Sequence, residues 1–137
     1  GDDPVELFFD DIKVGVVRIP HAGWPGRADV SNLVYRVTLN DEVTVMHLGD
    51  ADPNDVHFKP WDRYWKKQLT NHALPPYWWL SGSAGIHIVR ARIHADDYTG
   101  VHVPVVVPDQ LKYSGADYFS EPGKMLILKS VKKTNDE

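Results

Sequence analysis

The chain has 137 residues, which is enough for one domain with a buried core but too few for two substantial domains. Hydrophobic residues make up 42% of the chain and charged residues 25%, a composition typical of a folded globular protein and not of a disordered one. The formal net charge of -4 argues against nucleic acid as a partner, because nucleic-acid-binding proteins usually concentrate Lys and Arg on one face.

The sequence contains no cysteine, which excludes disulfide bonds and thiolate ligands, so a zinc-like ion would have to be bound by His, Asp or Glu. No apolar run approaches the roughly 20 residues that a membrane-spanning helix needs, so no membrane span is expected. Because the sequence starts at Gly1 and not at Met, we expect this end to be a processed or cut terminus. Residues 1–130 are predicted to form a single domain and residues 131–137 a polar tail.

The first half of the chain reads mainly as β-structure. Residues 12–19 alternate and are rich in valine and isoleucine, which predicts a strand that ends just before His21. After a loop rich in Gly, Pro, Asp and Asn, residues 33–39 and 42–48 predict two strands of a β-hairpin around a polar turn. These strands place a histidine before the hairpin and an aspartate, Asp50, after it.

Helices and further strands are predicted in the second half. Asp52, followed by proline and then by an acidic residue, favours a helix start with Asp52 as the cap. Apolar residues at helical spacing predict helices over 61–69 and 86–93. The valine-rich stretch 101–107 predicts a strand, 108–119 a short helix and 124–129 a last strand. This order of elements predicts an α/β fold with a mixed sheet.

Three candidate ligands, His21, Asp50 and His102, lie at or near the ends of predicted strands. Side chains at the ends of separate strands can converge on one rim of a sheet. Imidazole and carboxylate groups both bind zinc well, and one carboxylate can bridge two ions. With seven histidines and nineteen acidic residues in the chain, such a trio can also arise from ordinary surface or capping residues, so spacing alone leaves both interpretations open.

The strings "RIPHAGWPG", "VSNLVYRVTLNDEVTVMHLGDADPNDVHF" and "TGVHVPVVVP" resemble the second half of the metallo-β-lactamase superfamily. In that superfamily a histidine after a strand precedes a hairpin that ends in a Gly-Asp step, and a final histidine closes the site. The resemblance covers most of the chain, and the segments "PPYWWL" and "DYFSEPG" are similar to a branch of generally uncharacterised hydrolases. The resemblance implies half of an αβ/βα sandwich, a mixed β-sheet with helices on one face.

The resemblance also implies roles for the three candidate ligands. His21 would be the third histidine of the first metal position, Asp50 the carboxylate that bridges both metals, and His102 the histidine of the second position. The implied cofactor is a divalent metal, with zinc expected first and manganese or iron as alternatives. Metal-activated water would then hydrolyse an ester, lactam, lactone or phosphoester bond of a small-molecule substrate.

The sequence departs from the family in one respect, because the His-x-His-x-Asp-His motif of the N-terminal half is absent. A metallo-hydrolase would therefore need the missing half or a partner chain to complete it. The alternative is a non-catalytic metal-binding or assembly module that keeps the half-fold. The full fold of that superfamily consists of two similar β/α halves whose sheets face each other, so one half alone would leave an apolar sheet face open. Such a patch usually marks an interface, so we expect the chain to pair with its missing half or with a second copy.

Other polar and aromatic residues near the candidate ligands have less definite roles. His47 is expected to face away from Asp50 and to support the metal ligands through an outer hydrogen bond, and Asp52, although favoured as a cap, is the other candidate for that outer position. Loop aromatics are expected either to line an apolar substrate pocket or to pack in the core: Trp24, Tyr77, Trp78 and Trp79. Surface or loop positions are expected for His57, His72, His87 and His94.

Overall fold

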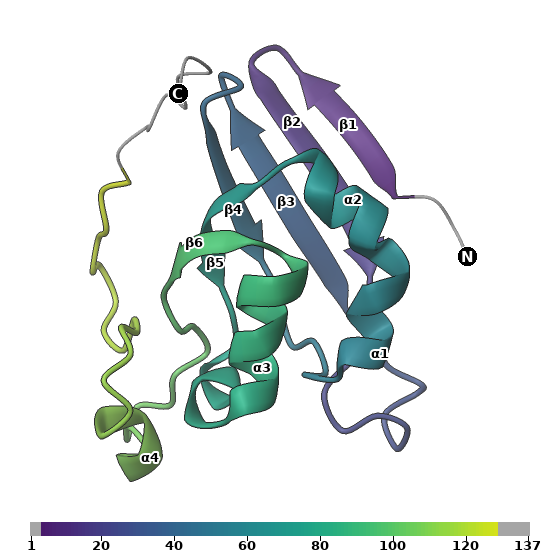
Figure 1. Ribbon diagram of the computed structural model, residues 1–137. Helices are drawn as coiled ribbons and strands as arrows, with labels where there is room; N and C mark the ends of the chain where they lie inside the picture. The colour runs from purple at the N-terminus through teal and green to yellow at the C-terminus, as the bar shows by residue number, and fades with distance from the viewer. Residues whose placement is uncertain (1–3, 129–137) are drawn as a thin grey trace.

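The computed structural model describes residues 4–128 and has an α/β architecture built on a six-stranded mixed sheet (Figure 1). Neighbouring strands in the sheet are also neighbours in the sequence. Adjacent strands among the first four are antiparallel, and the last two strands are parallel to the fourth. The predicted α/β class with a mixed sheet is confirmed. The strands are β1 (Val5–Phe9), β2 (Ile12–Arg18), β3 (Leu33–Leu39), β4 (Val43–His47), β5 (Thr70–Leu74) and β6 (Ala95–Tyr98).

Short helices provide the crossovers that parallel strands need. Between β4 and β5 lie α1 (Asp55–Phe58), the 3-10 turn η1 (Lys59–Trp61) and α2 (Asp62–Lys67). Between β5 and β6 lie the 3-10 turn η2 (Tyr77–Ser81), α3 (Ser83–His87) and the π-helical segment η3 (Ile88–Arg92), and α4 (Asp109–Lys112) follows β6. Figure 1 shows α1, α2 and α3 lying over one face of the sheet. In residues 4–128, no helix combines the length and the apolar character that crossing a bilayer requires.

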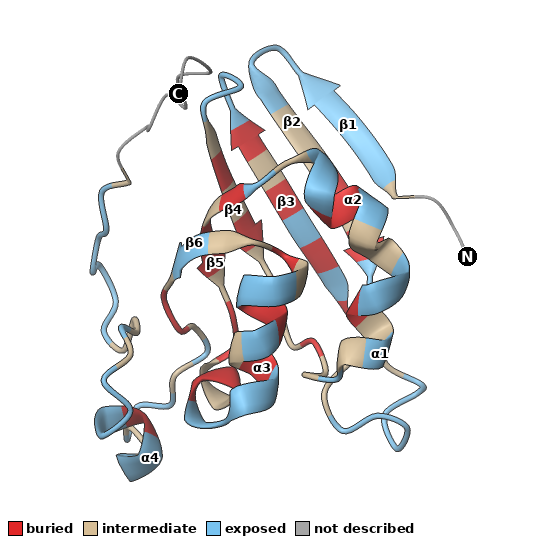
Figure 2. Cartoon of the chain, in the orientation of Figure 1, coloured by how far each residue is buried: buried red, intermediate tan, exposed pale blue. Residues whose placement is uncertain are grey.

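The hydrophobic core lies between the sheet and this helical layer. On β3, Val34, Arg36 and Thr38 are buried whereas the residues between them are more exposed, the period of two expected of a strand with one covered face (Figure 2). The covered face packs against large apolar side chains of the helical layer, namely Phe58, Trp65, Trp79, Ile88, Val89 and Ile93. The helices predicted over 61–69 and 86–93 contribute most of these side chains.

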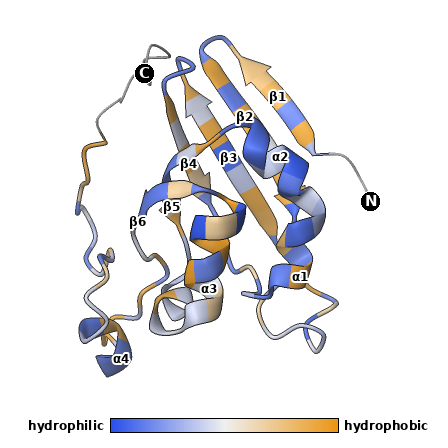
Figure 3. Cartoon of the chain, viewed as in Figure 1, coloured by the Kyte–Doolittle hydropathy of each residue, from blue (hydrophilic) through white to orange (hydrophobic). Residues whose placement is uncertain are grey.

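The opposite face of the sheet is apolar and lies away from α1, α2 and α3. Cross-strand partners share a face, and one row runs through Leu7, Val14, Val37 and Val45. Two further rows flank it, Phe9–Ile12–Leu39–Val43 and Val5–Val16–Tyr35–His47. Leu7, Tyr35 and Leu39 belong to the exposed large hydrophobic residues of the protein, and Figure 3 marks the apolar positions along β1 to β3. We call these three rows the open sheet face.

The prediction of strands over 101–107 and 124–129, after β6, is wrong for the residues that the structure describes. Residues 101–107 contain one isolated bridge, at Val101, and Val105 is 99% exposed. Pro104 has no backbone N–H to donate, and the parallel pairing with β5 is completed earlier, by β6. Residues 124–128 form no strand either, and Lys129 and the predicted tail 131–137 lie outside the described residues. Conversely, β1 is a strand that the sequence did not predict.

Three assignments of polar residues also need correction. Asp52 is not the cap of α1, because that helix begins at Asp55 and the Asn54 side chain accepts the hydrogen bond from Val56 N–H at 3.1 Å. His57 and His72 are not surface residues: the side chain of His57 is 8% exposed and His72 is 3% exposed. A neighbour that the sequence could not show, Thr99 Oγ1, lies 2.8 Å from His72 Nε2.

Burial lowers the pKa of His72, with Asp97 and Asp117 opposing the effect, so the folded chain favours the neutral ring. A histidine in an unfolded chain binds its proton near pH 6.5. The contribution of the neutral His72 ring to the free energy of unfolding is therefore complete above about pH 6.5. It decreases as the pH falls from there toward the lower pKa of His72 in the folded state. We expect the Tm at about pH 5 to be lower than at about pH 7.5, and the difference to shrink in His72→Gln. An equal difference in both proteins would contradict this.

Candidate metal centre

A turn directly after β4 places Asp50. Gly49 has a φ of +58°, a conformation that glycine adopts readily and other residues adopt at a cost. The Asn32 side chain holds this turn on both sides, since its Nδ2 donates to the Leu48 carbonyl at 3.2 Å and its Oδ1 accepts from Asp50 N–H at 2.8 Å. The buried Asn32 therefore fixes the backbone from which the Asp50 carboxylate projects.

The segment after β2 lies against the segment that follows Asp50. Ala22 N–H donates to the Asp50 carbonyl at 2.7 Å, and Asp52 N–H donates to the Pro20 carbonyl at 2.8 Å. These bonds form an antiparallel bridge between His21 and Ala51. As a result His21 and Asp50 occupy adjacent positions on one rim of the sheet. The Ala51 carbonyl also accepts the Trp79 indole N–H at 2.9 Å, which ties this segment to the core.

The Asp50 carboxylate lies between two imidazole rings. Its Oδ2 is 3.4 Å from Nε2 of His21, and its Oδ1 is 3.6 Å from Nε2 of His102. His102 reaches the rim because Val101 pairs with the segment after β5, through the Pro76–Val101 bridge. The three side chains are all partly exposed to solvent. The three ligands predicted from the sequence are therefore brought together in space.

The hydrogen bond of His21 fixes which of its nitrogens faces Asp50 with a lone pair. Nδ1 lies 2.9 Å from the Ala22 carbonyl, and because a carbonyl only accepts hydrogen bonds, Nδ1 carries a hydrogen. In a neutral ring Nε2 then presents its lone pair toward the Asp50 carboxylate. Two lone pairs, one on Nε2 of His21 and one on the Asp50 carboxylate, then face each other. A proton or a cation between them would stabilise this arrangement. Two ligands of one tetrahedral zinc ion are about 3.3–3.4 Å apart, given bonds of about 2.0–2.1 Å.

The described residues do not make a complete metal site. Within residues 4–128, no three His, Asp or Glu side chains are close enough together to hold one metal ion. The two oxygens of Asp50 face different rings, so each candidate position has two ligands: Asp50 with His21, and Asp50 with His102. The donor types fit a divalent cation, and the number of donors leaves each position open to further ligands.

His47 contacts His102 and not the carboxylate. Its ring meets that of His102 edge-on, with the centroids 5.9 Å apart, and its Nδ1 accepts the Gly49 N–H at 3.0 Å. Burial lowers the pKa of His47, the nearby His102 lowers it further, and Asp50 raises it. A neutral His47 that accepts at Nδ1 carries its hydrogen on Nε2, so a role outside the ligand set stays the prediction for this residue.

The remaining predicted site residues separate into different places. Asp52 lies 3.2 Å from His57, measured from its Oδ2 to Nε2, and together with Trp24 it lines a cavity beside the rim. Trp79 is buried, and Tyr77 packs edge-on to Trp78 with centroids 5.3 Å apart. Of the four loop aromatics, Trp24 alone lines that cavity.

Sequence reasoning did not single out Asn32 or His57. An asparagine directly before a strand is a common turn residue, which is the signal that could have drawn attention to Asn32. Nothing in the sequence distinguishes His57 from a surface histidine of a short helix, because its burial against Trp24 and Asp52 depends on tertiary contacts.

No protein-family model, curated protein or solved structure matches this chain. The described side chains are the remaining indication of its function. They place one carboxylate between two imidazoles on an accessible rim, and both are groups of the kind that bind divalent cations.

We predict that Gly49→Ala disrupts this rim. A Cβ atom at Gly49 would lie 2.5 Å from Asn32 Oδ1 and would require a left-handed backbone conformation. We expect a loss of at least about 1 kcal/mol in the free energy of unfolding, measured by urea denaturation. Gly82→Ala is the matched control, since nothing lies within 4 Å of a Cβ there and its φ of -142° suits any residue. Equal stability of the two variants would contradict the role given to the turn.

Proposed function

We propose that the chain is the C-terminal portion of a metal-dependent hydrolase of metallo-β-lactamase type. The fold would then be half of an αβ/βα sandwich, and the metal ligands supplied by this half would be His21, Asp50 and His102. The observation that carries the proposal is the position of Asp50, whose two carboxylate oxygens face two different histidines. A carboxylate in that position is suited to bridging two cations.

The side chains present have separate tasks in such a reaction. A bound divalent metal, zinc first and manganese or iron as alternatives, would supply hydroxide near neutral pH for attack on an ester, lactam, lactone or phosphoester bond. His21 presents Nε2 to that position because the Ala22 carbonyl holds Nδ1. Asp50 supplies negative charge to both positions, and Asn32 keeps its backbone in place. His47, held by Gly49 N–H, supports His102 from behind.

We predict that the isolated chain binds zinc weakly and through Asp50. In Asp50→Ala both candidate positions lose one of their two ligands, so zinc binding followed by isothermal titration calorimetry should fall by at least about tenfold, a typical cost of losing a direct metal ligand or its close support. Asp29→Ala, an exposed aspartate in the loop after β2, is the matched control and should bind zinc as the unaltered chain does. If both variants bind zinc equally, the assignment of Asp50 is wrong.

The open sheet face supports the other part of the proposal, that a second layer completes the molecule. Its three rows are apolar from β1 to β4, apart from His47, which ends one row. That row reaches the candidate metal centre, because His47 contacts His102. A layer packed on this face would bury the apolar rows and bring further side chains to the rim where ligands are lacking. The missing N-terminal half is the covering layer expected first, and a second copy is the alternative.

We predict that the isolated chain self-associates through the open sheet face when nothing else covers it. Light scattering after gel filtration should give a mass above that of one chain, rising with concentration. Leu39→Lys places a charge in an outer row and should shift the mass toward the monomer. Val56→Lys, at an exposed apolar residue of α1 on the helical side, should not. A monomeric mass for the unaltered chain up to millimolar concentration would count against the covering layer.

A non-catalytic metal-binding or assembly module is the second candidate. The observation that favours it is the number of ligands, because in residues 4–128 no three-residue metal cluster occurs. The two candidates differ in what a covering layer adds. Addition of a partner half should produce hydrolysis of a test ester in the first case, and only a stable complex in the second.

A further inference from the structure

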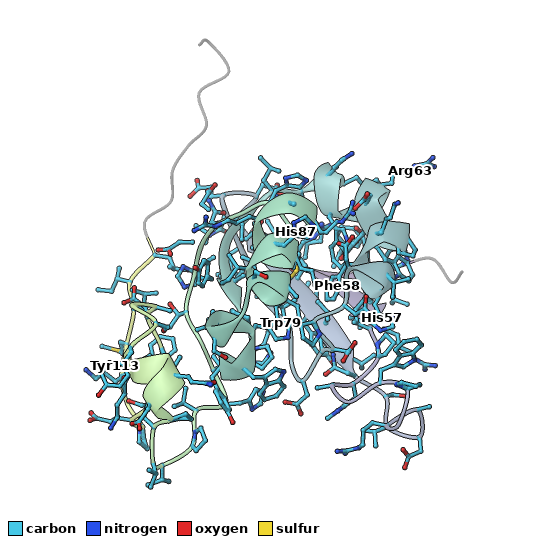
Figure 4. The ribbon with its side chains drawn as sticks, turned by 60° about the horizontal axis from the view of Figure 1, so that its bottom comes forward. His57, Phe58, Arg63, Trp79, His87 and Tyr113 are labelled. Atoms are coloured by element: carbon cyan, nitrogen blue, oxygen red, sulfur yellow. The ribbon has the colours of Figure 1, made fainter. Side chains whose placement is uncertain are left out.

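A wide-mouthed cavity of about 840 Å³ lies on the same two chain segments that carry His21 and Asp50. Trp24 lines it from the loop after β2, Asp52 and Asp55 line it at the start of α1, and His87 lines it from α3. Figure 4, in which the lower end of Figure 1 comes forward, labels His57 of α1 and His87 of α3. The cavity is therefore separate from the three metal-ligand candidates but next to them along the chain.

One of the two carboxylates in the cavity lining, Asp55, is already paired with an arginine. Arg92 donates from Nε to Asp55 Oδ1 at 2.6 Å and from Nη2 to Asp55 Oδ2 at 2.7 Å. This paired hydrogen bonding holds the pKa of Asp55 below its usual value. Arg92 also reaches Asp62 at 2.9 Å. The negative charge of Asp55 is therefore balanced by Arg92.

The other carboxylate, Asp52, has no such partner. Among the ion pairs of residues 4–128, the partner of Asp52 is His57 alone, with Nε2 3.2 Å from Oδ2. The Asp52 side chain is 14% exposed, and His57 Nε2 is buried without a hydrogen-bond partner among the described atoms. Unlike Asp55, Asp52 has no Lys or Arg partner among residues 4–128. Its carboxylate can therefore accept a charge-assisted hydrogen bond from a positively charged ligand.

Trp24 supplies an aromatic wall beside this carboxylate. Trp24 is 44% exposed although it is large and apolar, and its ring stands edge-on to that of His57, with centroids 4.7 Å apart. Because His57 also lies 3.2 Å from Asp52, this packing places the indole on the side of the cavity that carries the Asp52 carboxylate. The face of an indole attracts cations when they approach within about 6 Å of the ring centre.

We propose that this cavity binds an organic cation, a primary alkylammonium group, with Asp52 as its counter-ion and Trp24 as its aromatic wall. Two carboxylates in the lining disfavour an anion. The proposal implies a substrate class, a hydrolysable compound that carries an amine, and this implication rests on the proposed hydrolase function. The binding of ammonium itself does not depend on metal or on activity.

The test compares n-butylammonium with 1-butanol, which has a similar shape and no charge, as ligands of the full chain. Binding is followed by two-dimensional NMR at about pH 8, where imidazole in water is neutral and a primary amine is protonated. We expect butylammonium to bind about tenfold more tightly than butanol or better, a difference typical of a hydrogen bond to a charged group. The shifted resonances should include the indole of Trp24.

Three variants locate the interaction. Asp52→Asn keeps the size of the side chain and should remove the preference for butylammonium, whereas Asp109→Asn, at an exposed aspartate of α4 outside the cavity lining, should keep it. Trp24→Leu should weaken butylammonium binding more than butanol binding, because leucine retains apolar contact without a π face. The NMR spectrum of each variant also reports whether it is folded.

Several results would overturn the proposal. These are equal affinity for butylammonium and butanol, an unchanged preference in folded Asp52→Asn, and binding of inorganic phosphate at the same residues. Asp50→Ala separates the two proposals, since it should lose zinc and keep butylammonium. If folded Asp50→Ala loses both zinc and butylammonium, the organic cation binds at the metal centre and the cavity assignment is wrong. If Asp52→Asn loses only the butylammonium preference, the hydrolase proposal is unaffected.

Discussion

The two hydrogen bonds between the Asn32 side chain and the Leu48–Asp50 turn are the contacts on which the candidate site depends. They join the residue before β3 to the residues after β4, so the hairpin is closed at the end where the carboxylate projects. The left-handed conformation of Gly49 makes this close approach possible. From there the backbone pairs with the segment around His21, and these backbone contacts place Asp50 between the two imidazoles.

Under the proposed function, a missing covering layer would explain both the open sheet face and the small number of ligands at the candidate metal centre. Each candidate metal position has two protein ligands, and the sheet has one covered face. His47 belongs to both features, because it ends an apolar row of the open sheet face and contacts His102 at the rim. A layer packed on that face would be adjacent to the positions where ligands are lacking. Burial of apolar surface and completion of the site would then occur in one association.

The sequence allowed a good part of this arrangement to be predicted. The hairpin and the helices over 61–69 and 86–93 follow from periodicity. His21, Asp50 and His102 were named because each lies at or near the end of a predicted strand, although the strand predicted around His102 does not form. Prediction from the sequence failed where the local residue pattern and the tertiary contacts favour different structures. The valines of 101–107 have strong β-propensity, yet within residues 4–128 their pairing is limited to the bridge between Val101 and Pro76, and Val105 and Val106 are exposed. The strand β1 was missed because Phe8 occupies a position where alternation would favour a polar residue, and it is highly exposed.

Buried polar residues could not be predicted from the sequence for a related reason. Asn32 and His57 acquire their roles from partners that are distant in the sequence or on another element, and residue type alone gives both a surface role. The same holds for His72, whose partner Thr99 lies beyond the next crossover.

The most direct test of the account is the position of a metal ion relative to Asp50. A crystal of this chain soaked with zinc and measured at the zinc absorption edge would locate the ion by its anomalous scattering. The account predicts a peak about 2 Å from a carboxylate oxygen of Asp50 and about 2 Å from Nε2 of His21 or His102. Zinc bound only at other histidines, with none beside Asp50, would contradict it.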